Sequence, residues 1–310
     1  MRTYLNNSEI TYRKNMYFPD WGCVRTLLTL YVYATAVIFG VLHFSRRCCV
    51  CVSGDGRGAA KIINRWVADK TANKITKLLA PDSVDSSTRL VLVNAVYFKG
   101  DWLEKFNARF TKNEDFHVSS HETVKAKLMR KEYESIAHGW NHELECEAIE
   151  LPYSGKKLSM FVLLPDQGSS LSQLEDKLTA ADLVDVAERF SMWGEEVTVW
   201  LPRFKLDEKL SLAEMLRAMG MRDLFTPGAA DLSGVDGSKG LSVSKVMHQA
   251  VVDVNEDGTE ATAALEEAAE KGIPEENFRA DRPFLFFIQH KATKSILFLG
   301  RLVRPASDAK

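Results

Sequence analysis

The distribution of cysteine along the chain is the feature that most constrains how it can fold. Cys23, Cys48, Cys49 and Cys51 lie in the first 51 residues, and Cys146 is the only cysteine after them. One cysteine cannot close a disulfide within the body of the chain, so that body must be held by buried apolar side chains. A chain of 310 residues, 45% of them hydrophobic, can build such a core.

The charges of the chain nearly balance. Lys and Arg number 40 and Asp and Glu number 42, which gives a formal net charge of −2. This balance argues against a nucleic-acid-binding protein, which would carry a dominant basic footprint. The ordinary apolar and charged fractions also exclude disorder of the whole chain.

Residues 1–56 differ in character from the rest, because Thr26–Ser45 is an uncharged apolar run long enough to cross a bilayer. Three interpretations stay open. The run is a signal anchor, with Arg46 and Arg47 favouring a cytosolic C-terminal side and with acylated cysteines beside it. It is a late signal peptide. Or it does not belong to the mature protein. The first interpretation predicts membrane association.

The body, residues 57–306, predicts a mixed architecture. Helical spacing predicts helices over Ala59–Leu79 and over Leu171–Phe190, the second with Ser170 as its N-cap. Leu90–Phe98 predicts a strand buried on both faces, and Phe284–Gln289 with Ser295–Leu302 predicts an antiparallel pair. Helices and strands do not alternate as βαβ units, so the fold class is α+β.

The residue patterns of common enzymes and cofactor sites are missing. The sequence has no Gly-rich phosphate loop, no nucleophile elbow and no zinc-protease motif. Asp253–Gly258 matches half of a calcium loop, but the twelfth position is Ala264 instead of a bidentate Glu. We therefore predict no enzyme activity of its own, no cofactor and no metal site.

The segment from Glu256 to Pro283 is rich in Ala and Glu and lies between two strong strands. Propensity alone predicts an exposed helix that ends at Gly272. The segment lacks an apolar stripe, however, and a long loop of small residues between core strands is usually functional. Composition leaves both interpretations open.

From about Gly58 to Pro305 the chain resembles the serpin family of serine protease inhibitors. Any one motif is weak, but their joint order over most of the chain is specific. The matching motifs, in chain order, are Ile63–Val67, Leu92–Trp102, Leu151–Tyr153, Leu201–Phe204, Val246–Ala250, Asn255–Ala261, Phe278–Phe286 and Leu297–Arg301.

The resemblance implies a partial serpin fold and suicide inhibition of a serine protease. The protease attacks an exposed reactive loop, here residues 256–283, and the cut loop inserts into the main sheet as a new strand. The resemblance also implies a secreted monomer without nucleic-acid partners. It assigns the hinge of the loop to Glu256, Asp257, Gly258, Thr259, Glu260, Ala261, Thr262, Ala263 and Ala264.

The reactive bond is predicted at Gly272–Ile273 or one residue earlier at Lys271–Gly272. Lys271 is favoured because it is the only basic residue of the loop before Gly272, and a trypsin-like protease requires a basic side chain there. Asn94 and His248 resemble the polar pair that latches the sheet where it opens. Trp102 resembles the aromatic residue at the upper end of that sheet.

The resemblance departs from the family pattern at the N-terminus, where the family's first third has no counterpart in residues 1–56. The strands at Leu90 and Leu241 that flank the insertion site are both present, so the topology still permits insertion. The alternative function is a non-inhibitory, truncated serpin-like protein that is membrane-tethered through residues 26–45.

Overall fold

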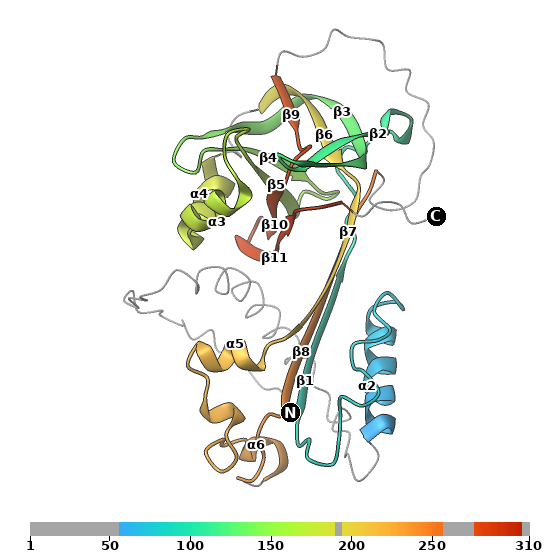
Figure 1. Cartoon of the computed structure of the whole chain (residues 1–310), viewed down its shortest axis with the longest axis vertical. Coiled ribbons are helices and arrows are strands. Elements are labelled where there is room, and N and C mark those ends of the chain that lie inside the picture. The colour runs from blue at the N-terminus through green and yellow to red at the C-terminus, as the bar shows by residue number, and fades with distance from the viewer. Residues whose placement is uncertain (1–55, 190–193, 238, 257–275, 306–310) are drawn as a thin grey trace.

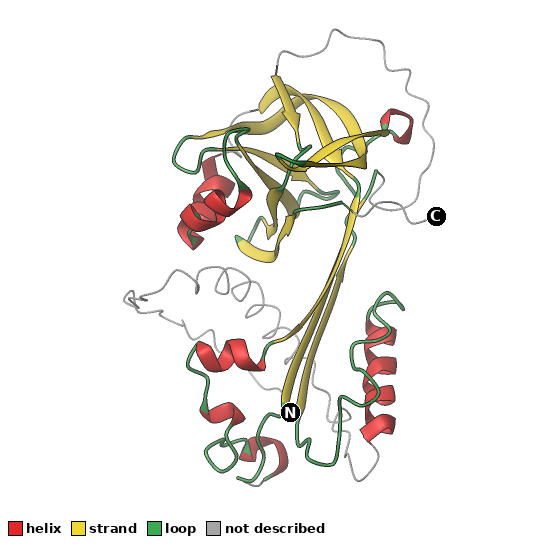
Figure 2. Ribbon diagram, viewed as in Figure 1, coloured by secondary structure: helices red, strands yellow, loops and turns green. Residues whose placement is uncertain are grey.

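The computed structural model describes residues 56–189, 194–237, 239–256 and 276–305, which form two sheets with helices packed against them. Figure 2 shows that strands dominate the upper part of the molecule and that a narrower sheet connects it to a lower, helical part. The strands are β1 (Val91–Phe98), β2 (Lys112–Ser119), β3 (Glu122–Asn141), β4 (Cys146–Pro152), β5 (Leu158–Pro165), β6 (Gly194–Pro202), β7 (Phe204–Ser211), β8 (Lys245–Val254), β9 (Glu276–Arg279), β10 (Phe284–His290) and β11 (Ser295–Leu302). The helices are α2 (Gly56–Lys70), α3 (Leu171–Lys177), α4 (Ala180–Arg189), α5 (Ala213–Ala218), α6 (Ser233–Asp236) and the short 3₁₀ turns η1 (Ala108–Phe110) and η3 (Asp223–Phe225).

The three-stranded sheet has the order β1-β8-β7 and lies between helices (Figure 1). On one face, Val67 of α2 packs with Val251 of β8, together with Ile75 and Leu78 of the segment after α2. On the other face, α5 and its neighbours form a separate apolar cluster with β8. The sequence prediction of a strand at Leu90–Phe98 is confirmed, but its burial is not. Every residue of β1 is only half-buried, because the described residues place β8 on one side of it alone.

The first helix is shorter than its apolar spacing predicts. It ends at Lys70 instead of Leu79 because Ala72 and Asn73 both adopt left-handed backbone conformations. Thr71 closes the turn by donating its hydroxyl to the carbonyl of Val67 at 2.8 Å. The apolar residues beyond this point are buried, but they belong to a loop that runs back beneath the helix.

The eight-stranded sheet has the order β11-β10-β5-β4-β3-β6-β9, with β2 paired to β3 outside this path. The long strand β3 joins its two parts, since its first part pairs with β2 and β6 and its end pairs with β4. One face of the sheet encloses the largest apolar cluster, which includes Phe116, Phe278 and Phe286. The predicted antiparallel pair is confirmed as β10 and β11.

Helices α3 and α4 cover the other face of the eight-stranded sheet through Leu174 and Val186. Ser170 is the N-cap of α3, as predicted, and it forms a capping box with Gln173. The single helix predicted over Leu171–Phe190 is wrong in length. The backbone is extended at Leu178, which separates α3 from α4.

Candidate functional site

The boundary between β1 and β8, here called the seam, is a parallel pairing of eight residues from Val91 opposite Lys245 to Phe98 opposite Val252. Midway along it, Asn94 lies opposite His248, and Asn94 Nδ2 is 3.1 Å from His248 Nδ1. The backbone ladder of the seam is thus accompanied by one polar side-chain contact that links the two strands directly.

His248 is 2% exposed, so its protonation state follows from its surroundings. Burial disfavours the charged imidazolium and lowers the pKa of His248 from its ordinary 6.5 to about 4. The ring is therefore neutral near pH 7. Because an amide nitrogen only donates, Nδ1 accepts the hydrogen bond from Asn94 and the ring proton sits on Nε2.

We predict that the seam loses stability in mild acid. Below about pH 6.5 the unfolded chain takes up a proton at this histidine more readily than the folded chain does. By pH 5 the free energy of unfolding should fall by about 2 kcal/mol from this group, and the loss continues down to about pH 4. Urea titrations at pH 7 and pH 5, on the wild type and on His248→Gln, measure it. Equal pH dependence in both proteins would contradict the assignment.

Beyond β8 the chain is held at Asn255 and Glu256, here called the N-terminal root because they precede residues 257–275. Trp102 donates its indole Nε1–H to the carbonyl of Asn255 at 2.8 Å. The indole is buried, stacks on Tyr153 with ring centroids 4.5 Å apart and meets the edge of Phe106 at 6.1 Å. An aromatic group of this size, packed on both sides, fixes where the chain leaves the sheet.

Glu256 is buried, at 8% exposure, and is held at both its backbone and its side chain. Its carbonyl accepts from the amide N–H of Phe106 at 3.1 Å, and its carboxylate accepts from the hydroxyl of Thr111 at 2.9 Å. The guanidinium of Arg203, which is half exposed, lies 3.8 Å from the other carboxylate oxygen. A buried carboxylate is tolerated here because a hydroxyl and a cation compensate its charge.

We predict unequal costs for removing the two sides of this contact. Glu256→Ala leaves the Thr111 hydroxyl without its acceptor and should lower the free energy of unfolding by about 1–3 kcal/mol. Arg203→Gln removes only a long, solvent-screened ion pair and should cost less than about 1 kcal/mol. Urea unfolding of both variants at pH 7 checks this. A loss for Arg203→Gln as large as for Glu256→Ala would contradict it.

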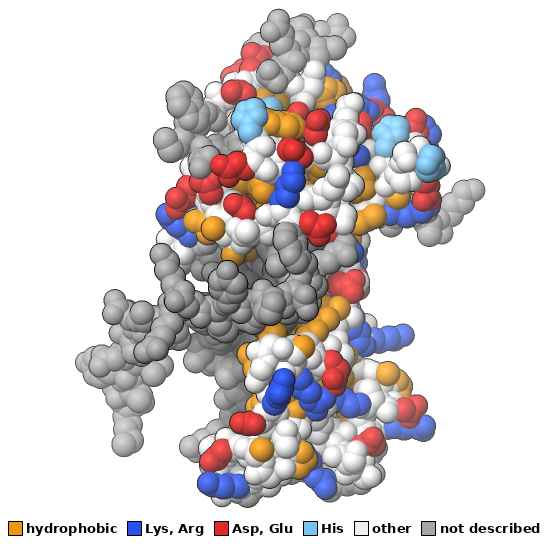
Figure 3. Space-filling view, turned by 60° about the vertical axis from the view of Figure 1, so that its left-hand side comes forward, with side chains coloured by type: hydrophobic (Ala, Val, Ile, Leu, Met, Phe, Trp, Pro, Cys, Tyr) orange, Lys and Arg blue, Asp and Glu red, His pale blue; other side chains and the backbone are white. Residues whose placement is uncertain are grey.

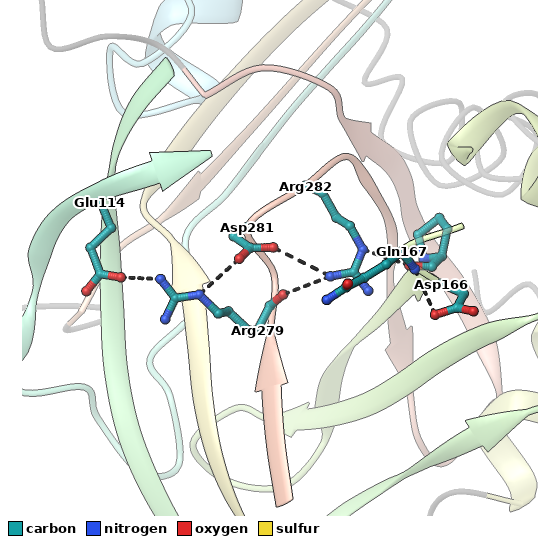
Figure 4. A network of polar contacts seen from close by, with 7 residues as sticks. Glu114, Asp166, Gln167, Arg279, Asp281 and Arg282 are labelled. Carbon is teal, nitrogen blue, oxygen red and sulfur yellow. Dashed lines mark hydrogen bonds and ion pairs between the residues drawn. The ribbon is translucent and has the colours of Figure 1, made fainter. Parts of the chain in front are cut away.

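The chain is fixed again after residues 257–275 at Phe278 and Arg279 of β9, here called the C-terminal root. The short strand β9 pairs in parallel with β6, and Phe278 is fully buried in the main core. The guanidinium of Arg279 bridges two carboxylates, of Glu114 on β2 and of Asp281, and its Nε lies 2.9 Å from Asp281 Oδ2 (Figure 4).

Four further contacts anchor this root. Arg279 lies over the indole ring of Trp200 on β6 at 5.3 Å. Arg282 donates its Nε–H to the carbonyl of Pro165 at 2.9 Å and contacts Asp281 at 3.5 Å. The backbone carbonyl of Asp281 also accepts from the amide N–H of His117. Arg279, Asp281 and Arg282 therefore attach the C-terminal root to β2, β5 and β6.

The structure describes four of the residues that the sequence assigned to the site. It brings Asn94 and His248 into contact and places Trp102 and Glu256 together at the N-terminal root. Asp257–Ala264 of the hinge and the reactive-bond residues Lys271, Gly272 and Ile273 lie outside the described residues, as does Thr26–Ser45.

Sequence reasoning missed the partners of the two roots. Phe106, Thr111 and Glu114 follow β1 without any recognisable pattern, so their approach to residues more than 140 positions later carries no local signal. Arg203 and Arg279 were noted as parts of motifs, but their ionic contacts depend on the tertiary fold.

The described residues lack the features of a metal site, of a cysteine nucleophile and of a membrane-spanning helix. Among them, no group of three His, Cys, Asp or Glu side chains is arranged to hold a metal ion. Cys146 is buried, and burial raises the pKa of its thiol to about 12, so it is not a ready nucleophile. No helix within the described ranges is long and apolar enough to span a membrane.

The two roots belong to different sheets, since the N-terminal root follows β8 of the three-stranded sheet and the C-terminal root lies on β9 of the eight-stranded sheet. A family model described as "Serpin (serine protease inhibitor)" matches residues 51–305. The chain belongs to the serpin family, as the sequence motifs predicted, and this family comprises protease inhibitors rather than enzymes.

Named relatives support the same assignment. The chain is 49% identical to the leukocyte elastase inhibitor of Bos taurus, over 80% of this chain and 67% of the relative, and 44% identical to that of Homo sapiens, over 80% and 66%. The structure resembles that of uncleaved ovalbumin with a TM-score of 0.73 and 36% identity, over 81% of this chain and 64% of ovalbumin. The chain thus spans about two thirds of the length of these proteins.

Proposed function

We propose that the chain inhibits a serine protease as a suicide substrate, by inserting its cut reactive loop into the seam. The observation that carries this proposal is the direction of the flanking strands. β1 and β8 run parallel, and the loop departs from the end of β8. A segment that turns back from that end runs antiparallel to both strands. Insertion would therefore replace one parallel ladder by two antiparallel ladders, which are the slightly more stable kind.

The chemical step uses the nucleophile of the protease. The protease serine attacks the carbonyl carbon of Lys271, the Lys271–Gly272 amide breaks, and the amine of Gly272 leaves with a proton from the protease histidine. The acyl ester then ties the protease to the residues that insert. The N-terminal root stays on β8 during insertion, because Trp102 and Phe106 hold Asn255 and Glu256 by hydrogen bonds.

Lys271 makes a trypsin-like protease the proposed target, since an acidic specificity pocket requires a basic side chain. The names of the relatives favour a second candidate. They are leukocyte elastase inhibitors at 44–49% identity, and elastases have a small specificity pocket. An elastase-like target would cut after a small residue of the loop instead of after Lys271.

We expect the intact chain to form a covalent adduct with trypsin that survives a denaturing gel, and to release the peptide that begins at Gly272. Lys271→Ala should lower the rate of adduct formation by about a hundredfold or more, because the charge that fits the pocket is lost. Lys271→Arg should keep the rate of adduct formation close to that of the wild type, because the positive charge is retained. Mass spectrometry of the released peptide locates the cut.

The same assay with leukocyte elastase separates the two targets. If only elastase forms an adduct, and the cut follows a small residue, the target is an elastase-like protease instead of a trypsin-like one. Clean cleavage by both proteases without adduct would contradict inhibition and favour the non-inhibitory alternative.

The hinge offers a test of insertion itself. Side chains alternate between the two faces of a strand, so Ala261 would face the core after insertion while the neighbouring Glu260 would face outward. Ala261→Arg should convert the chain into a cleaved substrate and reduce the adduct fraction at least about tenfold, since a buried unpaired cation opposes insertion. Glu260→Arg is the matched control and should keep most of the adduct. Equal adduct fractions for both variants would contradict insertion.

For location, we propose secretion on the basis of the family resemblance, with membrane anchoring through residues 26–45 as the alternative. Fractionation of cells that express the full chain separates the two. Recovery from the medium supports secretion, whereas recovery from carbonate-washed membranes supports anchoring.

A further inference from the structure

The outer face of α2 combines apolar and basic side chains. Ile62 and Trp66 are four positions apart, so they lie on one face of the helix. Their exposed fractions are 52% and 37%, although residues of this type are normally buried when a helix packs on a sheet. The opposite face of α2 is the one that packs, through Ala60 and Val67.

A row of cations borders this apolar pair. Arg57, Lys61 and Arg65 follow one another at four-residue spacing, and all three are exposed. Lys70 follows Trp66 at the same four-residue spacing that separates Trp66 from Ile62. Asp69 is the one acidic residue of the helix. In the space-filling view of Figure 3, acidic and basic side chains both appear across the upper part of the molecule.

The cations of α2 belong to a charge asymmetry of the whole chain. Residues 1–77 contain 12 Lys and Arg against 4 Asp and Glu, whereas the remaining residues contain 28 against 38. The net charge of −2 therefore conceals a basic N-terminal quarter, which also holds the apolar run Thr26–Ser45. An asymmetry of this kind favours an anionic partner for the basic part.

We propose that the outer face of α2 docks onto an anionic phospholipid surface. Lys61, Arg65 and Lys70 would contact lipid headgroups, while Ile62 and Trp66 would enter the interface, where an indole ring is favoured. A polyanion such as nucleic acid would satisfy the cations but not the exposed isoleucine. The chain's own residues 1–55 do not complement this face, because they contain six basic and three acidic residues.

The short distance in sequence between α2 and the apolar run Thr26–Ser45 supports a lipid surface as the partner. Ten residues separate Ser45 from Gly56 and span at most about 35 Å. If the apolar run enters a bilayer, α2 must lie within that distance of its surface. Arg46 and Arg47 favour the cytoplasmic leaflet, which is the anionic one. The inference therefore agrees with the membrane-anchored alternative, and it is independent of the inhibitory activity.

Vesicle sedimentation of the full chain tests the docking. The chain should bind phosphatidylcholine vesicles containing 30% phosphatidylserine more tightly than pure phosphatidylcholine vesicles, with the difference reduced at high salt. Lys61→Glu combined with Arg65→Glu should lower the partition coefficient on the anionic vesicles by about tenfold or more. In the matched control, Lys156→Glu with Lys157→Glu makes the same charge change on the exposed turn between β4 and β5 and should leave binding nearly unchanged.

A second readout reports on Trp66 directly. Its emission, taken as the difference between the wild type and Trp66→Phe, should be quenched by lipids that carry a nitroxide near the headgroup. Four results would overturn the proposal: binding that does not depend on phosphatidylserine, equal losses in both charge variants, an unquenched Trp66, or binding to DNA or heparin without binding to vesicles. Binding independent of phosphatidylserine and of the α2 charges would instead assign membrane attachment to residues 26–45 alone.

Discussion

The parallel pairing of β1 with β8 is the contact on which the arrangement of the other elements depends. It connects two stretches of chain that are about 150 residues apart in sequence, and α2 and α5 pack on its two faces. Its upper end carries Trp102 and Glu256, and the strands themselves contribute to the main core through Phe98 and Val252. A ladder of parallel hydrogen bonds is the weaker kind of pairing, and here it includes a buried histidine that must stay neutral.

The contacts at the N-terminal and C-terminal roots differ in kind from those of the seam. Each root combines a buried aromatic ring with several directed polar contacts, which come from Trp102 and Thr111 at one end and from Glu114 and Asp281 at the other. The seam has its backbone ladder and the contact between Asn94 and His248. Under the proposed mechanism this difference is useful, because the roots must hold while the seam opens.

Much of this architecture can be predicted from the sequence. The features that cannot be predicted have physical causes. The apolar run of β1, the capping box at Ser170 and the strand pair β10–β11 follow from short-range patterns. The end of α2 does not, because the left-handed residues Ala72 and Asn73 interrupt an apolar spacing that continues beyond them. The half-burial of β1 depends on its place in the sheet order, and a linear sequence does not state that order.

The residues of the candidate site also fall into those that the sequence predicts and those that only the folded structure reveals. Asn94, His248 and Glu256 were assigned through family motifs, and the structure places them in polar contacts at the seam and its end. Thr111, which caps η1, and Glu114, on the polar strand β2, were not anticipated, since such hydroxyl and carboxylate side chains resemble ordinary solvent-facing residues. Their partners come from distant parts of the chain, and only the folded arrangement brings them together.

Strands β9, β10 and β11 follow residues 257–275 in the chain, so a cut within that segment separates them covalently from the other strands of their sheet. Phe284, Phe286 and Ile288 of β10 are buried at the centre of the main core, and β10 is hydrogen-bonded to β5 and to β11. The piece of chain after the cut would therefore keep its place by its strand pairing with β5 and by packing, and the burial of these side chains is worth several kcal/mol. A nicked molecule would behave as one particle in native solution, and its two pieces would separate only when the core is dissolved.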